Sequence, residues 1–303
     1  MPSWKEIKSR IKSVKNTGKI TKAMELISTV KMKKAQEAVV WLRPFALATL
    51  SILGKISTDE SILGSYAVAP NSTKELIILV ASQKWLCGGY NTNVFKKTTE
   101  YIRDDSDTPY TREYHYITIG KRARDFILRT GQHLLADFSE EMKDPLTPAE
   151  SRRMVRTIVD EWKSGKYAKI SMIYNHYVSA ISQIPTVKTL FPINGVEIFG
   201  FLEKYAWGKY TAEHYDGAYT IEPDRETIVD MTIPLILDGI VHETLLEAKA
   251  SEHAARMVAM KNAKDSANKK ASGLTLIYNK TRQAAITKEV SEIVSGVESM
   301  KDL

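Results

Sequence analysis

Apolar residues recur every three or four positions near the start of the chain, which is the pattern of a helix with one buried face. This stripe consists of Ile7, Ile11, Val14, Ala35, Ala38, Leu42, Phe45, Ile52 and Ile56. Ser3 and Glu6 have the spacing of a capping box, in which each side chain satisfies a backbone N–H at the helix end. We therefore expect residues 1–60 to form a helix that begins at about Trp4 and bends at Pro44, where one helical hydrogen bond is lost.

The other end of the chain carries a longer helical pattern. From Leu235 to Leu303 there are 69 residues without a proline, rich in strong helix formers, and one helix of this length spans roughly 100 Å. A final stripe has the coiled-coil spacing of four and three and consists of Ile286, Val290, Ile293, Val297 and Met300. A compact domain of this size cannot bury such a helix. We expect residues 222–303 and 1–60 to pack as a protruding antiparallel coiled coil.

Two registers of this pair are compatible with the pattern. With the helix ends flush, Val14 faces Ile293; with a stagger of some 26 residues, Val14 lies near Ala267 and Met24 near Met257. The staggered register sets large side chains against small ones, as in well-packed layers. We predict the stagger, which leaves about the last two dozen residues as a lone helix whose apolar stripe needs an outside partner.

The middle of the chain alternates between strand and helix patterns. Segments rich in β-forming residues are 74–82, 113–119, 169–177 and 185–191, and helical patterns lie at 91–103, 121–129 and 149–163. The last helix opens with a capping box at Thr147 and Glu150, with proline at its first position. This alternation predicts a Rossmann-like α/β layer domain over residues 72–210 with a largely parallel sheet. Residues 200–222 are expected to connect it to the C-terminal helix.

The positive charge of the chain is concentrated at its N-terminal end. Residues 1–34 carry ten basic and two acidic side chains, a net +8, whereas the remaining 33 basic and 34 acidic residues give −1. Such a segment is attracted to a polyanion: nucleic acid, anionic lipid or an acidic protein surface. The alternative is a solvated helix face with no partner.

Sequence motifs for catalysis, cofactors and metals are missing. The segment 86–91, Leu-Cys-Gly-Gly-Tyr-Asn, follows a strand and opens a helix, but it matches neither of the glycine-rich phosphate-binding patterns. We expect a tight turn there. Cys87 is the single cysteine, so no internal disulfide can form, and this favours a reducing compartment. The six histidines lack zinc-site spacing, and no nucleophile elbow is present. We predict no catalytic residue, no cofactor and no metal ion.

Several separated stretches carry a family resemblance. They are residues 7–26 (IKSRIKSVKNTGKITKAMEL), 252–263 (EHAARMVAMKNA) and 278–289 (YNKTRQAAITKE), the last followed by 292–296 (EIVSG), together with the turn 86–91. These stretches resemble the gamma subunits of F-type ATP synthases, closely in the two terminal helices and loosely in the middle. The chain departs from the family at Gln83, Lys84 and Trp85, where an acidic residue and a glycine are usual, and it has no paired-cysteine insertion like that of the chloroplast form.

The resemblance implies a non-catalytic central stalk that couples proton-driven rotation to ATP synthesis or hydrolysis on beta subunits. It implies as partners three alpha and three beta subunits, small delta- or epsilon-type stalk subunits and the membrane ring of c subunits, and no nucleic acid. Carried over by residue, Met24 and Arg256 should lie near an acidic beta loop, and Arg282 and Gln283 should hydrogen-bond another beta loop. The stripe from Ile286 to Met300 should turn in an apolar sleeve.

Two other classes of function remain open at this point. A helical nucleic-acid-binding protein would use the N-terminal lysines against phosphates, with a steep dependence on salt; a nucleotide-dependent enzyme would use the α/β domain. For location, the first 24 residues are basic and amphipathic and could act as an internal import signal. Because the middle of the chain diverges from the family, we expect the matrix side of the mitochondrial inner membrane, with the cytoplasmic face of a bacterial plasma membrane as the alternative.

Overall fold

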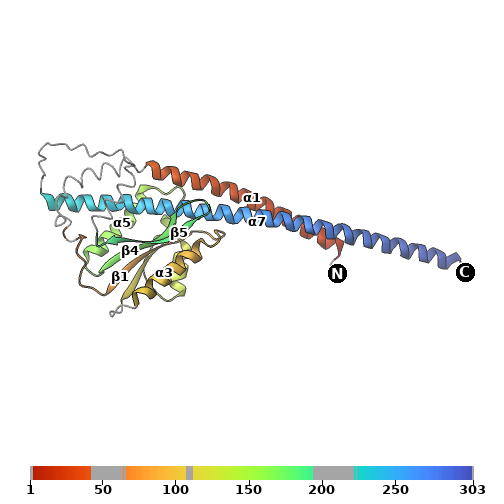
Figure 1. The fold of residues 1–303 in the computed structure, drawn as a ribbon, viewed down its shortest axis with the longest axis horizontal. Helices are drawn as coiled ribbons and strands as arrows, with labels where there is room; N and C mark the ends of the chain where they lie inside the picture. Colours follow the sequence, from red (N-terminus) through yellow and green to blue (C-terminus); the bar gives the residue numbers. More distant parts are fainter. Residues whose placement is uncertain are drawn as a thin grey trace. The chain divides into compact units, whose positions relative to one another are not determined.

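The computed structural model describes residues 3–41, 64, 66–106, 112–193, 222 and 224–301 (Figure 1). It divides into two compact units, residues 1–28 with 257–303, and residues 29–256. The elements are α1 (Trp4–Trp41), β1 (Lys74–Val80), α3 (Tyr90–Ser106), β2 (Glu113–Ile119), α4 (Lys121–Arg129), β3 (His133–Asp137), the short 3-10 helix η2 (Ser139–Glu141), α5 (Pro148–Lys163), β4 (Lys169–Tyr177), β5 (Gln183–Phe191) and α7 (Arg225–Lys301). The predicted bend at Pro44, the stripe from Leu42 to Ile56, and most of the connecting region 200–222 lie outside the described residues.

A five-stranded sheet of order β3-β2-β1-β4-β5 organises the unit of residues 29–256. β1 pairs in parallel with β2 and β4, and β2 with β3, whereas β4 and β5 are antiparallel. The predicted α/β domain with a largely parallel sheet is therefore confirmed. The sequence pattern missed β3, a five-residue edge strand that is too short to show a clear alternation of apolar and polar positions.

The two faces of the sheet are covered by different helices. On β1, Leu76, Ile78 and Val80 point toward the core shared with α5 and the first part of α7. Ile77 and Leu79 point the other way, into a smaller core with α3 and α4, because successive side chains of a strand alternate between faces. Residues 225–256 of α7 are thus a layer of the α/β domain as well as the start of a long helix.

α7 begins ten residues before the proline-free stretch identified in the sequence. Asp224 caps its first turn by accepting hydrogen bonds from the backbone N–H of Thr227 at 2.8 Å and from the Thr227 hydroxyl at 2.8 Å. Pro234 lies inside the helix. The helix continues past this proline because the residues around it, Ile233 and Ile236, are buried in the core and hold it in place.

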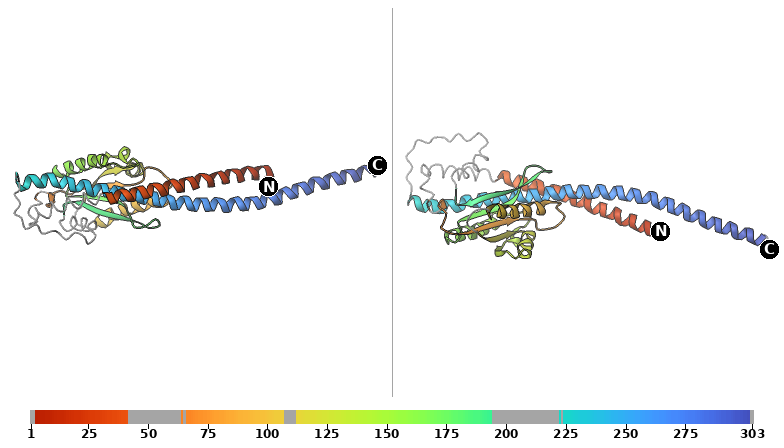
Figure 2. Two further views of the ribbon diagram at one scale, coloured as in Figure 1. Left: turned by 90° about the horizontal axis from the view of Figure 1, so that it is seen from above. Right: turned by 60° about the horizontal axis from the view of Figure 1, so that its bottom comes forward.

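In the other compact unit, α1 and α7 run antiparallel side by side (Figure 2). α1 begins at Trp4 as predicted, and Ser3 and Glu6 exchange the two hydrogen bonds of the capping box. The segments that contact each other confirm the antiparallel pairing, since Trp4 meets Tyr278 and Glu25 meets Lys264. Within the described part of the chain, no helix has both the length and the apolar character needed to cross a bilayer.

Candidate partner-contact surface on the terminal helices

The buried face of α1 follows the heptad period along its whole described length. The less exposed positions, spaced four and three apart, are Ile7, Ile11, Val14, Gly18, Thr21, Glu25, Ser28, Met32 and Ala35. We call these positions the seam. Its middle, from Gly18 to Ser28, consists of small or polar residues, which is why the apolar pattern is interrupted between Val14 and Met32. Thr21 and Ser28 satisfy their buried hydroxyls by donating to backbone carbonyls one turn back in the same helix, Thr17 and Met24.

The contacts along the seam confirm the staggered register. A Cβ placed on Gly18 would lie 3.6 Å from the Cβ of Ala267. Lys264 Nζ donates to a Glu25 carboxylate oxygen at 2.8 Å, and this hydrogen bond raises the pKa of Lys264. The pairing differs from the predicted one by about a turn at this point, because Gly18 rather than Val14 faces Ala267. Two small residues allow the helix backbones to approach closely there.

The last part of α7 is exposed along an apolar stripe. All positions from Ile286 to Val297 are exposed, and the fractional exposures of Ile286, Val290, Ile293 and Val297 lie between 47% and 65%. The side chain of Met300 lies outside the described residues. We call residues 286–301 the tip. Its apolar stripe is the feature that the predicted sleeve requires, although contact with a sleeve stays a prediction.

The residues predicted to contact partner loops fall into two groups. Arg282 and Gln283 are exposed on α7, and the Arg282 guanidinium lies 6.0 Å from the centre of the Tyr278 ring. Met24 on α1 is half-buried. Each of these positions leaves side-chain surface for a partner, and their roles remain predictions.

Arg256 differs from these residues because its guanidinium is already hydrogen-bonded to other residues of the same chain. It is 8% exposed, donates to Glu252 Oε1 at 2.6 Å and to the backbone oxygen of Lys84 at 3.3 Å, and lies 3.3 Å from His253 Nδ1. A partner carboxylate would have to displace these contacts. The sequence motif identified Arg256 but could not show that its guanidinium is hydrogen-bonded within the chain, because Lys84 lies 172 positions away.

The predicted tight turn at residues 86–91 lies at the carboxyl end of β1, beside β4. In doubly wound sheets, ligands bind at such an edge where the strand order reverses. Here Leu86 adopts a positive φ of 68° and Gly88 one of 57°. The buried Tyr90 hydroxyl donates to the backbone oxygen of Ala248 at 3.1 Å, and burial raises its pKa. α7 thus contacts this edge directly, through the first residue of α3.

Cys87 is a structural thiol in this turn. It is 2% exposed and lies 3.6 Å from the Ser82 hydroxyl, while the Asn91 side-chain amide donates to its sulfur at 3.4 Å. Burial raises the pKa of the Cys87 thiol. A protonated, enclosed sulfur is a poor nucleophile.

Known proteins resemble the chain over nearly its full length. A sequence model of the family described as ATP synthase matches residues 3–300. The ATP synthase gamma chain of Roseiflexus castenholzii is 36% identical over 307 residues, covering 100% of both chains. That of Pelotomaculum thermopropionicum is 33% identical over 305 residues, covering 99% of this chain and 100% of its own. The chain belongs to the ATP synthase gamma chain family. Membership over nearly the whole chain decides against the nucleic-acid-binding and nucleotide-dependent enzyme classes, and it makes the chain a non-catalytic subunit.

Solved structures share the fold of this chain. A chain in the cryo-EM structure of the Euglena gracilis mitochondrial ATP synthase, OSCP/F1/c-ring, aligns with a TM-score of 0.61 at 18% identity, over 98% of this chain and 94% of that one. A chain in the central stalk/c-ring structure from Tetrahymena thermophila aligns with a TM-score of 0.57 at 22% identity, over 80% of this chain and 99% of that one.

Proposed function

We propose that the chain is the rotating central stalk of an F-type ATP synthase, which couples proton-driven rotation to ATP synthesis or hydrolysis on beta subunits. The observation that carries this proposal is the tip of α7. The start of α1 meets α7 at Tyr278, and the apolar stripe from Ile286 onward is exposed in the isolated chain. Apolar side chains without fixed polar partners suit a surface that must turn against its surroundings.

The partners follow from the family and from the charge of the paired helices. Three alpha and three beta subunits would surround α1 and α7, with small delta- or epsilon-type stalk subunits and the ring of c subunits at the α/β domain. On α1, five lysines spaced three and four apart line one exposed face: Lys5, Lys8, Lys12, Lys15 and Lys19. This face suits the acidic beta loop that the family resemblance implies, because opposite charge steers association.

The location follows at a coarser level from the same family. The relatives named above are bacterial gamma chains, the aligned structures are mitochondrial, and in both cases the protein is a peripheral part of a membrane-bound ATP synthase. The matrix side of the mitochondrial inner membrane, expected from the divergent middle domain and compatible with the basic first 24 residues, stays a prediction. The bacterial relatives support the alternative, the cytoplasmic face of a plasma membrane. Fusion of residues 1–24 to a reporter, followed by import into isolated mitochondria, separates the two.

Reconstitution tests the function itself. The purified chain is expected to hydrolyse no ATP, whereas its addition to alpha and beta subunits of a relative should give an ATP-hydrolysing complex in which a bead fixed to the chain rotates. A matched variant that ends at Ala285 keeps the seam and lacks the tip, and it should form complexes that rotate less persistently. Azide-sensitive hydrolysis by the chain alone, or a hydrolysing complex with a stationary bead, contradicts the proposal.

A further inference from the structure

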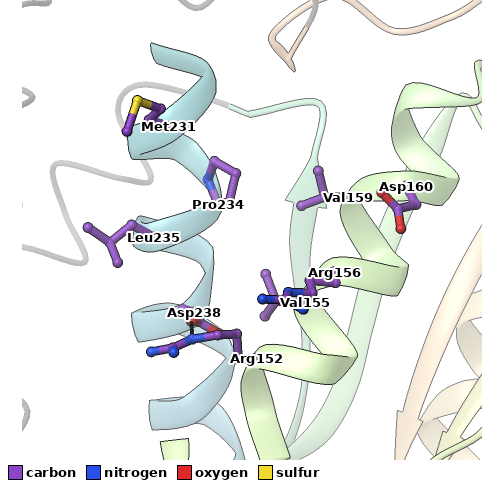
Figure 3. Close-up of a pocket in the computed structure, with 9 residues that line it drawn as sticks. All are labelled: Arg152, Val155, Arg156, Val159, Asp160, Met231, Pro234, Leu235 and Asp238. Carbon is purple, nitrogen blue, oxygen red and sulfur yellow. Dashed lines mark hydrogen bonds and ion pairs between the residues drawn. The ribbon is translucent and has the colours of Figure 1, made fainter. Parts of the chain in front are cut away.

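Residues 238–256 of α7 are held by directional polar contacts from several elements of the α/β domain. These contacts are Arg152–Asp238 at 3.0 Å (Figure 3), Lys188–Glu243 at 4.0 Å, His176–Glu247 at 2.8 Å, Tyr90 hydroxyl to Ala248 oxygen at 3.1 Å, Lys249–Asp144 at 2.8 Å and Arg256 to Lys84 oxygen at 3.3 Å. Apolar packing is non-directional. It therefore keeps a helix against the sheet but does little to prevent the helix from rotating about its own axis. Hydrogen bonds and ion pairs depend on angle and therefore fix that rotation.

Asp144 is distinguished among these residues because it holds both helices. It lies in the loop between η2 and α5, and its two carboxylate oxygens receive Lys249 Nζ of α7 at 2.8 Å and Lys31 Nζ of α1 at 2.9 Å. His253 of α7 adds a third contact, with its Nε2 at 3.4 Å. One carboxylate of the α/β domain thus joins α1 to α7 inside the unit of residues 29–256.

The contacts on the α7 side are fixed in orientation. Lys249 is 4% exposed, and its Nζ also donates to the backbone oxygen of Met142 at 3.0 Å, which holds the ammonium against the loop. His253 accepts a hydrogen bond from Arg256 at Nδ1, so its Nε2 carries the hydrogen that points to Asp144. Arg256 in turn reaches Glu252 and the backbone of Lys84. A continuous polar chain therefore runs from α1 through Asp144 to the turn at the end of β1.

The protonation of Asp144 agrees with this arrangement. Burial alone would raise its pKa, but the hydrogen bond from His253, the charge of Lys249 and the hydrogen bonds from both lysines outweigh burial. The pKa of the Asp144 carboxyl is held well below its ordinary value. The carboxylate is therefore charged near neutral pH.

We propose that Asp144 is a positioning residue for torque transfer, a clasp that locks α1 and α7 to the α/β domain so that the domain turns together with both helices. The inference rests on the proposed function as a central stalk. Both helices continue from the paired unit into the unit of the α/β domain, so a twisting force travels along them. A single helix can turn within apolar neighbours, whereas two helices tied to one point between them resist twisting as a pair.

Single-molecule rotation tests the clasp. In the complex with alpha and beta subunits, a bead is fixed to the α/β domain through Arg129→Cys, an exposed site on α4, while the buried Cys87 stays unlabelled. The variance of the bead angle during pauses is inversely proportional to the torsional stiffness between the bead and the surrounding ring. Asp144→Asn is expected to raise this variance by about twofold or more, because it leaves the buried Lys249 without its counter-charge. Asp144→Glu, which keeps the carboxylate, should stay near the wild-type value.

A matched control distinguishes the clasp from the general loss of an ion pair. Asp238→Asn removes the charge that faces Arg152, in a contact that ties α5 to α7 alone, and should raise the variance clearly less than Asp144→Asn because α1 stays tied. Wild-type variance in Asp144→Asn, or an equal rise in Asp238→Asn, overturns the inference. If Asp144→Asn does not assemble, Lys31→Met is measured and read the same way, because the half-exposed Lys31 forms the α1 arm of the clasp. A wild-type complex whose bead does not rotate contradicts the proposed stalk function instead.

Discussion

At the scale of single residues, some polar side chains are paired with other residues of this chain, whereas others are exposed to solvent. Arg256 and Lys249 are buried and have partners within the chain, Glu252 and the partly exposed Asp144, whereas Arg282 and Gln283 are exposed. The first group controls stability, because removing one member leaves another charge buried without its counter-charge. The second group is available to partners.

Asp144→Asn should therefore lower the stability of the full chain in a pH-dependent way. We expect a loss of about 1–3 kcal/mol near pH 7, less than the roughly 3–5 kcal/mol of breaking a fully buried pair, because Lys249 is buried but the Asp144 side chain is 30% exposed. The pKa of Asp144 is lowered in the folded state, so as pH falls below about 4 the unfolded chain takes up the proton first and the wild type loses this contribution. Urea unfolding of wild type and variant at several pH values measures the loss of stability and its dependence on pH. The difference between wild type and variant should shrink below pH 4, and a constant difference down to acid pH would contradict the assignment.

Arg282→Glu should slow turnover in the assembled complex without changing the stability of the isolated chain. The guanidinium is exposed, and a fork-shaped donor that pairs with a partner carboxylate contributes more than an exposed pair. Lys280→Glu is the matched control, since it makes the same charge change at an exposed position two residues away. Equal turnover in the two variants and the wild type would remove Arg282 from the partner surface.

At the scale of elements, the seam between α1 and α7 depends on small and polar residues in its middle. Gly18 and Ala267 allow close approach there, and Glu25 with Lys264 adds a hydrogen-bonded ion pair. A polar contact inside a helical seam discriminates between registers, because a shift would separate the pair.

Disulfide trapping tests this register. In the double variant Gly18→Cys with Ala267→Cys, the Cβ atoms should lie about 3.6 Å apart, which is inside the range that a disulfide needs. The pair should oxidise readily and lose two titratable thiols. Val14→Cys with Ile293→Cys, which fits the flush register, should keep its thiols. The reverse result would restore the flush register and remove the unpaired tip.

At the scale of the whole molecule, apolar burial is divided unevenly between the two units. The α/β domain with residues 225–256 of α7 buries a large apolar core on both faces of its sheet. The paired helices bury few large side chains, among them Ile7 and Met260, and the tip buries none among its described positions. Since burial of apolar area is the main stabilising contribution, local stability should follow this order.

Hydrogen exchange of the isolated chain should therefore show three levels of protection. Strands β1 and β4 should exchange most slowly, the paired residues 257–281 faster, and the tip fastest, because an unpaired helix is marginal in water. In the assembled complex the tip alone should gain strong protection if a sleeve covers it. Equal protection of the tip in the free chain and the complex would contradict the bearing.

The local pattern of the sequence determined most of the elements and the type of the central sheet. Helix and strand periodicity, the capping boxes at Ser3 and Thr147, and the alternation of elements are local properties of the chain, so they could be read directly. The principle of placing large residues against small ones favoured the stagger over the flush register, although the residue that faces Ala267 is the small Gly18 and not Val14. The family resemblance supplied the function, which no local chemistry indicates.

The tertiary structure decided what depends on residues far apart in the chain. It added the edge strand β3 and showed that α7 begins at Arg225, ahead of Pro234. It also showed that the pairing of α1 with α7 differs from the predicted one by about a turn, so that Gly18 faces Ala267. It also enclosed Arg256 and brought Asp144 to Lys31 and Lys249, more than a hundred positions away in each direction. Periodicity reports which face of an element is apolar, but not which distant polar group will satisfy a buried charge. That choice is made only when the elements pack, because the cost of an unpaired charge arises only after water has been excluded.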